Sequence, residues 1–288
     1  MVAFENREMP KLDKLHNNFY GASFELMKLL PARFILEQAM KKRQLKKGDK
    51  IVETSSGTFA LALAMISNVE GFELTIVSDP AIDRKLKMRL ERLGTKVVIV
   101  DSENVDEKGG YQKLRLEKLY EILSSGNYFW PQQYDNLMNR EAYCKYAGYL
   151  VENLGKIDYL IGPVGSGGSM VGTAKYLKKL FPDLKVVDVD TPNSVLFGQK
   201  NGERKLRGLG NSIHPENLDV SLFDYISWVP AELAFEYTKR LYSEKSLFMG
   251  PTSGATYLVG KYFYGIHSAK KIVCNFPDEG YRYIDTVY

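Results

Sequence analysis

The stretch DYLIGPVGSGGSMVGTAKYLKKL, residues 158–180, holds five small residues in a row between an apolar run and a segment of helical character. This pattern predicts a strand that turns directly into a helix. The backbone N–H groups of the turn and the helix dipole behind them favour an anion, and glycines let a ligand approach closely. The turn therefore predicts a phosphate site, although a tight turn without a ligand explains the same residues.

Two nucleotide-binding motifs fit this turn poorly. A P-loop ends in Gly-Lys-Ser/Thr, which is missing here. A dinucleotide fingerprint is matched by Gly165 and Gly167 but has Met170 in place of its third glycine, while Asp190 ends the next strand at a suitable distance. A nucleotide-binding protein is therefore an alternative that depends on Asp190 alone.

Short apolar strands alternate with longer amphipathic segments along the chain. We predict strands at 50–54, 73–79, 95–101, 158–164, 184–190 and 271–276, helices at 31–42, 59–66 and 140–154, and loops at 101–111 and 191–218. Near-continuous Val/Ile runs joined by helices indicate an α/β protein with mainly parallel sheets flanked by helices. In such sheets ligands bind at the carboxyl ends of strands, where the glycine turns of this chain lie.

Composition narrows the class of protein. With 288 residues, 44% of them hydrophobic, the chain can fill two lobes, and a net charge of +4 from 39 basic and 35 acidic residues argues against a nucleic-acid partner. Cys144 and Cys274 lack any metal-binding or disulfide pattern, and His16, His214 and His267 are too dispersed for a metal site, so no metal is expected. No apolar stretch reaches the ~20 residues that cross a bilayer, and a cytoplasmic protein without a membrane partner is expected.

Two further turns place hydroxyl groups between a strand and a helix. IVETSSGTFALALA, residues 51–64, could hold a carboxylate through the hydroxyls and free N–H groups of its turn, which contains Ser55, Ser56, Gly57 and Thr58. MGPTSGATYLVG, residues 249–260, places Thr252 and Ser253 just before another helical pattern. A helix N-cap explains either turn alone.

At these three turns the chain resembles the cysteine synthase family, the β-replacement branch of fold type II pyridoxal-phosphate (PLP) enzymes. The family's Thr-Ser-Gly-Asn turn is similar to residues 55–58, its Gly-Thr-Gly-Gly-Thr phosphate cup to 165–169, and its Ser-Ser-Gly-Ala turn to 252–255. QQYDN (132–136), KLRGLGNSIHPENL (205–218) and FPDEGYRY (276–283) are further matches in the right order. The resemblance covers the chain from about residue 25 to its end.

The family binds PLP through a lysine, and Lys28 stands 27 residues before Ser55, at the family's spacing. Lys28 is a lone charge between two apolar pairs and ahead of Pro31, a good first residue for a helix. Apolar burial and a positive helix terminus disfavour an ammonium group, which favours the neutral amine that forms an imine. Without the resemblance, an ordinary lysine that reaches solvent explains Lys28 equally well.

The resemblance implies a role for each matched residue. Lys28 is the catalytic lysine, and the cofactor-binding residues are Lys28, Thr58, Gly165, Ser166, Gly167, Gly168, Ser169 and Thr252, with Ser253 as the other candidate for the pyridine nitrogen. The substrate-binding residues are Ser55, Ser56, Gly57, Thr58 and Gln133. The implied fold has a small lobe, 22–137, with the lysine and the substrate-carboxylate loop, and a large lobe, 1–21 plus 138–288, with the phosphate cup.

The implied function is PLP-dependent β-replacement on a β-substituted L-amino acid, such as O-acetylserine, O-phosphoserine or cysteine, through an aminoacrylate. The alternatives are a β-elimination lyase or dehydratase that releases sulfide or ammonia, and a non-catalytic scaffold or nucleotide-binding protein. The family's Lys-Asp-Arg is here Lys28-Leu29-Leu30, and its turn Asn is Thr58, which crowds the side where the amino acid binds. Small-molecule amino acids and a second copy of the chain, as a homodimer, are the expected partners.

Overall fold

The structure, a computed structural model, describes residues 2–101, 110–206 and 208–288. The chain divides into two compact units, which are described here one at a time. Unit 1 comprises Met1–Asn6 with Lys28–Asn136, and unit 2 comprises Arg7–Met27 with Leu137–Tyr288. The lobe boundaries expected from the sequence stay a prediction.

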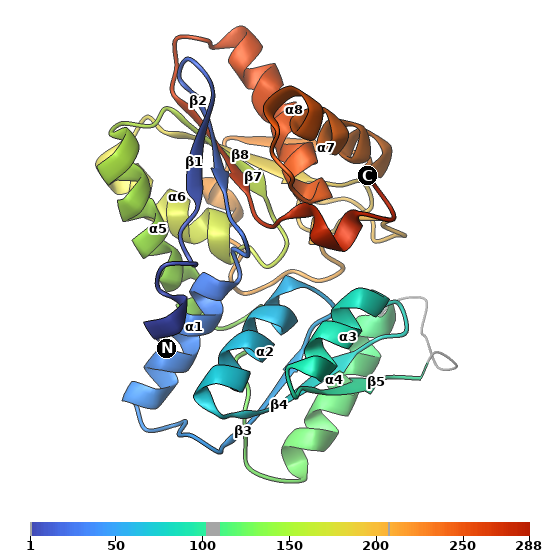
Figure 1. The fold of residues 1–288 in the computed structure, drawn as a ribbon. Helices are drawn as coiled ribbons and strands as arrows, with labels where there is room; N and C mark the ends of the chain where they lie inside the picture. The colour runs from blue at the N-terminus through green and yellow to red at the C-terminus, as the bar shows by residue number, and fades with distance from the viewer. Residues whose placement is uncertain (1, 102–109, 207) are drawn as a thin grey trace. The chain divides into compact units, whose positions relative to one another are not determined.

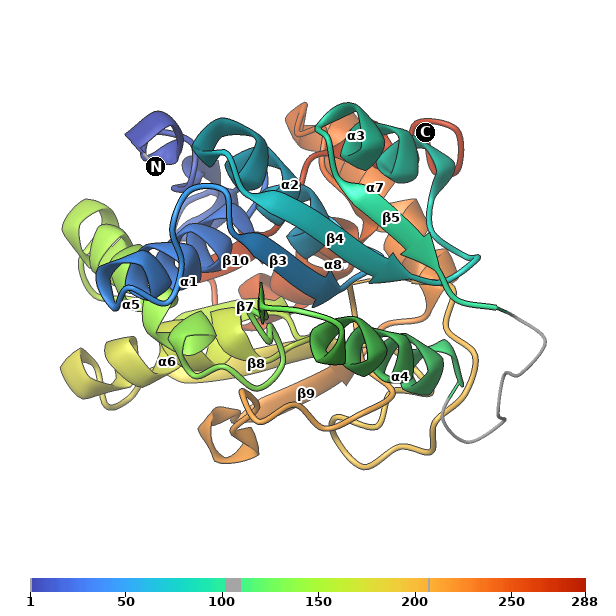
Figure 2. The same cartoon turned by 90° about the horizontal axis from the view of Figure 1, so that it is seen from below.

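Unit 1 is built on a four-stranded parallel sheet with the order β5-β4-β3-β6. Its strands are β3 (Lys50–Thr54), β4 (Glu73–Ser78), β5 (Lys96–Ile99) and β6 (Tyr128–Phe129), and its helices are η1 (Val2–Phe4), α1 (Leu29–Lys41), α2 (Thr58–Glu70), α3 (Arg84–Arg92) and α4 (Gly110–Ser124). Figures 1 and 2 show α2 and α3 on one face of this sheet and α4 on the other. Because both faces are covered, β3 and β4 are almost continuously buried.

Unit 2 contains a six-stranded sheet with the order β1-β2-β10-β7-β8-β9, in which only the β1–β2 pair is antiparallel. Its strands are β1 (Lys11–His16), β2 (Phe19–Ser23), β7 (Tyr159–Pro163), β8 (Lys185–Asp190), β9 (Tyr225–Trp228) and β10 (Ile272–Phe276). Its helices are α5 (Met138–Leu154), α6 (Gly168–Leu180), α7 (Ala231–Lys245) and α8 (Pro251–Ile266), with the short η2 (Val220–Leu222) and η3 (Gly280–Tyr283). Figure 1 shows α5 and α6 on one face and α7 and α8 on the other.

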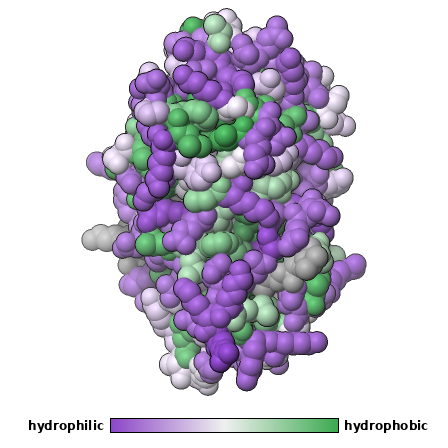
Figure 3. Space-filling model, turned by 90° about the vertical axis from the view of Figure 1, so that its left-hand side faces the viewer, coloured by the Kyte–Doolittle hydropathy of each residue, from purple (hydrophilic) through white to green (hydrophobic). Residues whose placement is uncertain are grey.

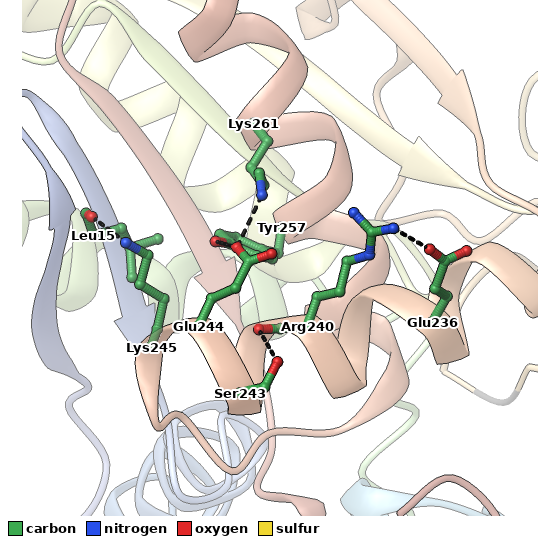
Figure 4. Close-up of polar contacts among 8 residues, drawn as sticks. All are labelled: Leu15, Glu236, Arg240, Ser243, Glu244, Lys245, Tyr257 and Lys261. Atoms are coloured by element: carbon green, nitrogen blue, oxygen red, sulfur yellow. Dashed lines mark hydrogen bonds and ion pairs between the residues drawn. The ribbon is translucent and has the colours of Figure 1, made fainter.

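Helices α7 and α8 are joined by a polar contact around Glu244 (Figure 4). One carboxylate oxygen accepts hydrogen bonds from the Tyr257 hydroxyl at 2.8 Å and from Lys261 Nζ at 2.9 Å. The next residue of α7, Lys245, donates from Nζ to the carbonyl oxygen of Leu15 in β1 at 2.9 Å. These bonds fix α8, which carries Thr252, against the rest of unit 2.

The contact between α5 and α6 depends on Gly172. A methyl group at this position would collide with the carbonyl oxygen of Arg140 and lie 3.1 Å from Cβ of Tyr143, both in α5. We expect Gly172→Ala to lower the free energy of unfolding by about 1–3 kcal/mol, because α5 and α6 would have to move apart. Urea denaturation measures the change.

The matched control is Gly148→Ala in α5, where the nearest atom to an added methyl group is the Tyr176 hydroxyl at 4.0 Å. Alanine is the better helix former, so this variant should be neutral or more stable by up to ~1 kcal/mol. Equal loss of stability in both variants would contradict the packing argument.

All six strands expected from the sequence are confirmed, within two residues at each end. The helices expected at 31–42, 59–66 and 140–154 are also present, but α1 starts at Leu29, so Pro31 is its third residue and not its first. Thr252 and Ser253 lie inside the first turn of α8, whose N-cap is Gly250, so the expectation that they precede the helix is wrong.

The two expected loops have different outcomes. The segment 191–206 and 208–218 contains neither helix nor strand, as expected, whereas residue 207 lies outside the described residues. Most of the expected loop at 101–111 also lies outside them, and its last two residues belong to α4. Among the described residues, no helix combines the length and the apolar character needed to cross a bilayer.

Candidate functional site

The β3–α2 turn of unit 1 leaves the start of a long helix open. Ser55 is 5% exposed, and its hydroxyl accepts a hydrogen bond from the Gly57 N–H at 3.3 Å. Gly57 is the N-cap of α2, and no side chain of the described residues caps it. A methyl group on Gly57 would meet no atom within 4 Å. Because the first N–H groups of a helix need acceptors, this open end suits a carboxylate.

Gln133 lies at the same turn. Its side chain is 5% exposed, and Nε2 donates to the carbonyl oxygen of Thr54, the last residue of β3, at 3.3 Å. The structure therefore brings together the predicted substrate residues of unit 1, which come from sequence segments about 80 residues apart.

A buried ion pair that the sequence did not point to lies beside this turn. Arg115 of α4 is 9% exposed, and its Nη1 lies 3.1 Å from Oδ2 of Asp79 and donates to the Ser56 hydroxyl at 3.4 Å. A hydroxyl that accepts from a guanidinium is left to donate its own proton elsewhere. Arg115 therefore orients Ser56 as a donor, which also suits an anionic ligand.

Lys28 occupies the position before α1, with φ −70° and ψ −10°. Its four nearest chain neighbours are buried apolar residues, namely Leu26, Met27, Leu29 and Leu30. Lys28 is half-buried, and burial of its amino group lowers the pKa of Lys28 from 10.5 to about 8. The expected weakening of the ammonium form is thus present in the structure.

In unit 2, the glycines of the 165–169 turn make room mainly for the protein itself. Gly167 has φ +80°, and a methyl group there would lie 2.9 Å from the carbonyl oxygen of Asn217. A methyl group on Gly168 would collide with the side chain of Asn139, and one on Gly165 would lie 3.4 Å from the Gly208 carbonyl oxygen. Both explanations that the sequence left open, ligand approach and a tight turn, therefore stand, because Gly165 and Gly167 pack the turn against the 208–218 segment and Gly168 packs it against Asn139.

The same turn starts α6 with an open N-terminus. Gly167 is the N-cap, and no side chain of the described residues caps it. Ser166 is 7% exposed, and its hydroxyl accepts from Nδ2 of the fully buried Asn139 at 3.4 Å. The thirteen-residue helix directs its positive end at this turn, so the residues present fit a phosphate group.

Thr252 and Ser253 lie in the first turn of α8, and both are buried. A methyl group on Gly208 would lie 3.7 Å from Cγ2 of Thr252, so Thr252 is close to the segment that packs on the glycine turn. Burial raises the pKa of Asp278 to about 6, while the Arg282 charge and the nearby Tyr283 and Thr252 hydroxyls hold it down. Unit 2 thus brings its four matched segments together, namely 165–169, 205–218, 252–255 and 276–283.

Five residues near these turns were missed from the sequence: Glu53, Asp79, Arg115, Asn139 and Asp278. Asp278 belongs to the matched FPDEGYRY segment, and Glu53 lies two residues before the matched turn at 55–58. Asp79, Arg115 and Asn139 lie outside the matched segments, and their contacts depend on the tertiary fold.

The dinucleotide alternative loses its one supporting residue. Asp190 is fully buried, its Oδ1 accepts from the Thr191 N–H at 2.7 Å, and burial raises its pKa to about 6. A methyl group on the neighbouring Gly210 would lie 2.8 Å from the same oxygen. Asp190 is thus enclosed by its own chain and not presented to a ribose.

Several solved structures have the same fold as this chain. A hydrogen sulfide-producing enzyme from Fusobacterium nucleatum is 28% identical, with a TM-score of 0.88 over 97% of this chain and 96% of that chain. Cysteine synthase from Entamoeba histolytica is 23% identical, with a TM-score of 0.86 over 96% and 87%. The O-acetylserine-dependent cystathionine beta-synthase from Helicobacter pylori is 23% identical, with a TM-score of 0.84 over 99% and 93%.

The family described as pyridoxal-phosphate dependent enzyme matches residues 11–278, which is nearly the whole chain. This match and the shared fold confirm the resemblance to fold type II enzymes of the cysteine synthase kind, with PLP as the cofactor. The chain therefore belongs to the family of PLP-dependent enzymes.

Proposed function

We propose that the protein catalyses β-replacement on a β-substituted L-amino acid such as O-acetylserine, O-phosphoserine or cysteine. The observation that carries the proposal is the open, uncapped start of α2, which is flanked by the Ser55 and Ser56 hydroxyls and by Gln133. Similar structures are named as a cysteine synthase and an O-acetylserine-dependent enzyme, which act on substrates of this class.

When bound, PLP supplies the electron sink that stabilises a carbanion at Cα of the amino acid. In the proposal Lys28 holds the cofactor covalently and, once displaced by the substrate, its amine takes the Cα proton. A pKa of about 8 suits this role, because roughly a tenth of such amines are neutral at pH 7.

The remaining matched residues bind and orient. Ser55, Ser56, Gly57, Thr58 and Gln133 bind the substrate carboxylate, with Arg115 directing the Ser56 hydroxyl as a donor. The turn at 165–169 binds the cofactor phosphate at the start of α6, and Thr58 and Thr252 contact the cofactor ring. This division of roles is supported by the two open helix ends.

A second candidate is β-elimination, in which water replaces the added nucleophile. It is supported by the 28% identical relative, which is named as hydrogen sulfide-producing. The deciding experiment incubates the PLP-loaded protein with O-acetylserine or O-phosphoserine, with and without sulfide, and with cysteine, with and without a different thiol such as 2-mercaptoethanol. β-Replacement predicts a new amino acid, elimination predicts pyruvate and ammonia, and unchanged substrates would contradict both.

The proposed contact of Thr252 with the pyridine nitrogen makes a quantitative prediction. Thr252→Val keeps the shape and removes the hydroxyl, so cofactor affinity should fall about two- to twelvefold, the value of one hydrogen bond of about 0.5–1.5 kcal/mol. Fluorescence titration of cofactor-free protein with PLP measures it. Ser253→Ala is the control and should change the affinity less. The opposite order would assign the contact to Ser253.

We further propose a homodimer and a cytoplasmic location, with the chain divided into lobes 22–137 and 1–21 plus 138–288. A dimer is supported by hydrophobic side chains that gather on part of the face of unit 2 in Figure 3. Exposed apolar residues of that unit include Tyr176, Leu180, Tyr225 and Trp228. Analytical ultracentrifugation would show twice the 32.7 kDa chain mass, whereas a monomer would contradict the proposal.

A further inference from the structure

Glu53 is a buried carboxyl group at the end of β3 that has no part in the proposed chemistry. Its side chain is 1% exposed, and Oε1 accepts hydrogen bonds from the Thr54 N–H at 2.8 Å and from the Trp130 indole N–H at 3.1 Å. Oε2 accepts from the Gln133 N–H at 3.2 Å. Since Gln133 Nε2 donates back to the Thr54 carbonyl oxygen, the carboxylate ties β3 to the segment that carries Gln133.

That segment has a backbone that needs support. Gln132 has φ +57°, in the left-handed region, and its carbonyl oxygen accepts from the Asp135 and Asn136 N–H groups. A residue other than glycine in this region is held there only when its surroundings fix it. Gln133 is the next residue along the chain, and the hydrogen bond from its N–H to Glu53 helps to hold the backbone in this conformation.

We propose that Glu53 is a positioning residue, whose carboxylate fixes Gln133 beside the β3–α2 turn and thereby sets the affinity for the carboxylate of the amino-acid substrate. The inference rests on the proposed function, in which Gln133 and this turn bind that carboxylate. Glu53 acts through Gln133 and does not itself touch the substrate.

The geometry requires the ionised form of Glu53. Its two oxygens accept from the N–H groups of Thr54, Trp130 and Gln133, and a protonated carboxyl would present an O–H to one of those donors. Burial raises the pKa of Glu53 to about 7, although these same hydrogen bonds hold it down. The ionised form is therefore present above pH 7 and is lost as the pH falls through 7.

The titratable Tyr134 lies within electrostatic range of Glu53, and burial raises the pKa of Tyr134 above its usual value of 10, so it stays neutral between pH 6 and pH 8. The Arg115 charge lowers the pKa of Tyr134, and the charges of Asp79 and Asp135 raise it. A change in binding between pH 6 and pH 8 that is missing without the Glu53 carboxyl can therefore be assigned to Glu53.

The first measurement reads Glu53 directly and needs no substrate. The chain has two tryptophans, and Trp228→Phe leaves Trp130, which donates to Glu53, as the only indole. In the holoenzyme carrying Trp228→Phe, tryptophan fluorescence should change with a midpoint near pH 7, and adding Glu53→Gln should remove the change. A flat curve in the Trp228→Phe protein, or a change that persists after Glu53→Gln is added, would overturn the inference whatever the protein catalyses.

The second measurement uses L-alanine, an amino acid without a leaving group, and follows its binding to the holoenzyme through cofactor absorbance. The rise in its Kd from pH 8 to pH 6 should be about tenfold larger in the wild type than in Glu53→Gln, because the ionised fraction of a group of pKa 7 falls about tenfold while the amino group of alanine titrates alike in both. Glu53→Gln places an amide N–H against the Gln133 N–H. The Kd of alanine for this variant should therefore be about 5- to 100-fold higher than for the wild type at pH 8, and the part of its pH dependence that comes from Glu53 should be missing.

A double-mutant cycle separates positioning from a general loss of structure. Gln133→Ala should weaken alanine binding, and Glu53→Gln should add little in the Gln133→Ala background because Glu53 acts through Gln133. Additive effects would overturn the positioning role. Fluorescence that titrates as expected in a holoenzyme that binds no amino acid would instead overturn the proposed function and, with it, the role of Glu53 in substrate binding.

Discussion

Lys28→Ala is expected to abolish covalent attachment of PLP and to lower the rate of β-replacement by about 10²–10⁴-fold, the contribution of a positioned acid–base group. The expected loss is large because Lys28 combines two roles, as the covalent anchor of the cofactor and as the base at Cα. The visible absorbance band of the covalent link and the rate of product formation measure these roles separately.

The matched control is Lys41→Ala, which removes an exposed lysine from the other end of the same helix. It should leave both the band and the rate unchanged. If the Lys28→Ala protein kept the absorbance band, another lysine would be the anchor, and the assignment from spacing would be wrong.

Gly167→Asp should have the largest effect on cofactor affinity among the substitutions in unit 2. Two costs combine at this position, since the left-handed backbone strains any side chain and a carboxylate repels the phosphate. Gly167→Asn has nearly the same size, tolerates a positive φ comparatively well and carries no charge. The ratio of the two variants' dissociation constants for PLP therefore isolates the charge.

The Gly167→Asp variant should bind PLP about 10- to 100-fold more weakly than the Gly167→Asn variant. This range is consistent with a unit charge a few ångströms from the phosphate in a partly shielded site. Both variants should bind more weakly than wild type, because an added side chain meets Asn217 and Leu218. Equal dissociation constants for the Asp and Asn variants would contradict the proposal that this turn binds the phosphate.

Local patterns in the sequence were enough for the strands. Runs such as KIVET and LKVVDVD are rich in Val and Ile, and after the first residue β3 and β8 are buried without interruption because both sheet faces are covered. Both strands lie within one residue of their predicted bounds. The helix expected at 59–66 extends to Glu70 because only Gly71, with φ +78°, ends α2.

The β1–β2 hairpin was missed although it carries a signal. His16 pairs with Phe19, so Asn17 and Asn18 form the two-residue turn, and Asn18 has φ +58°. Two asparagines between short strands are typical of such turns. The charged residues of KLDKLH concealed the strand, because β1 is an edge strand with much of its surface exposed.

The matched turns were visible in the sequence because each is a short continuous segment. The partners that hold them were not, because Glu53 meets Gln133 across 80 residues and Arg115 meets Ser56 across 59. No local pattern predicts contacts over such distances.

The start of α1 was misplaced for a local reason, since Leu29 and Leu30 already belong to the helix and Pro31 is accepted in its first turn.

The most direct test of the central claim is to reduce the PLP-loaded wild-type protein with borohydride, digest it and locate the cofactor mass by peptide sequencing. We expect the cofactor on Lys28, the buried amine whose pKa is lowered to about 8. The cofactor on any other lysine, or on none, would contradict the account.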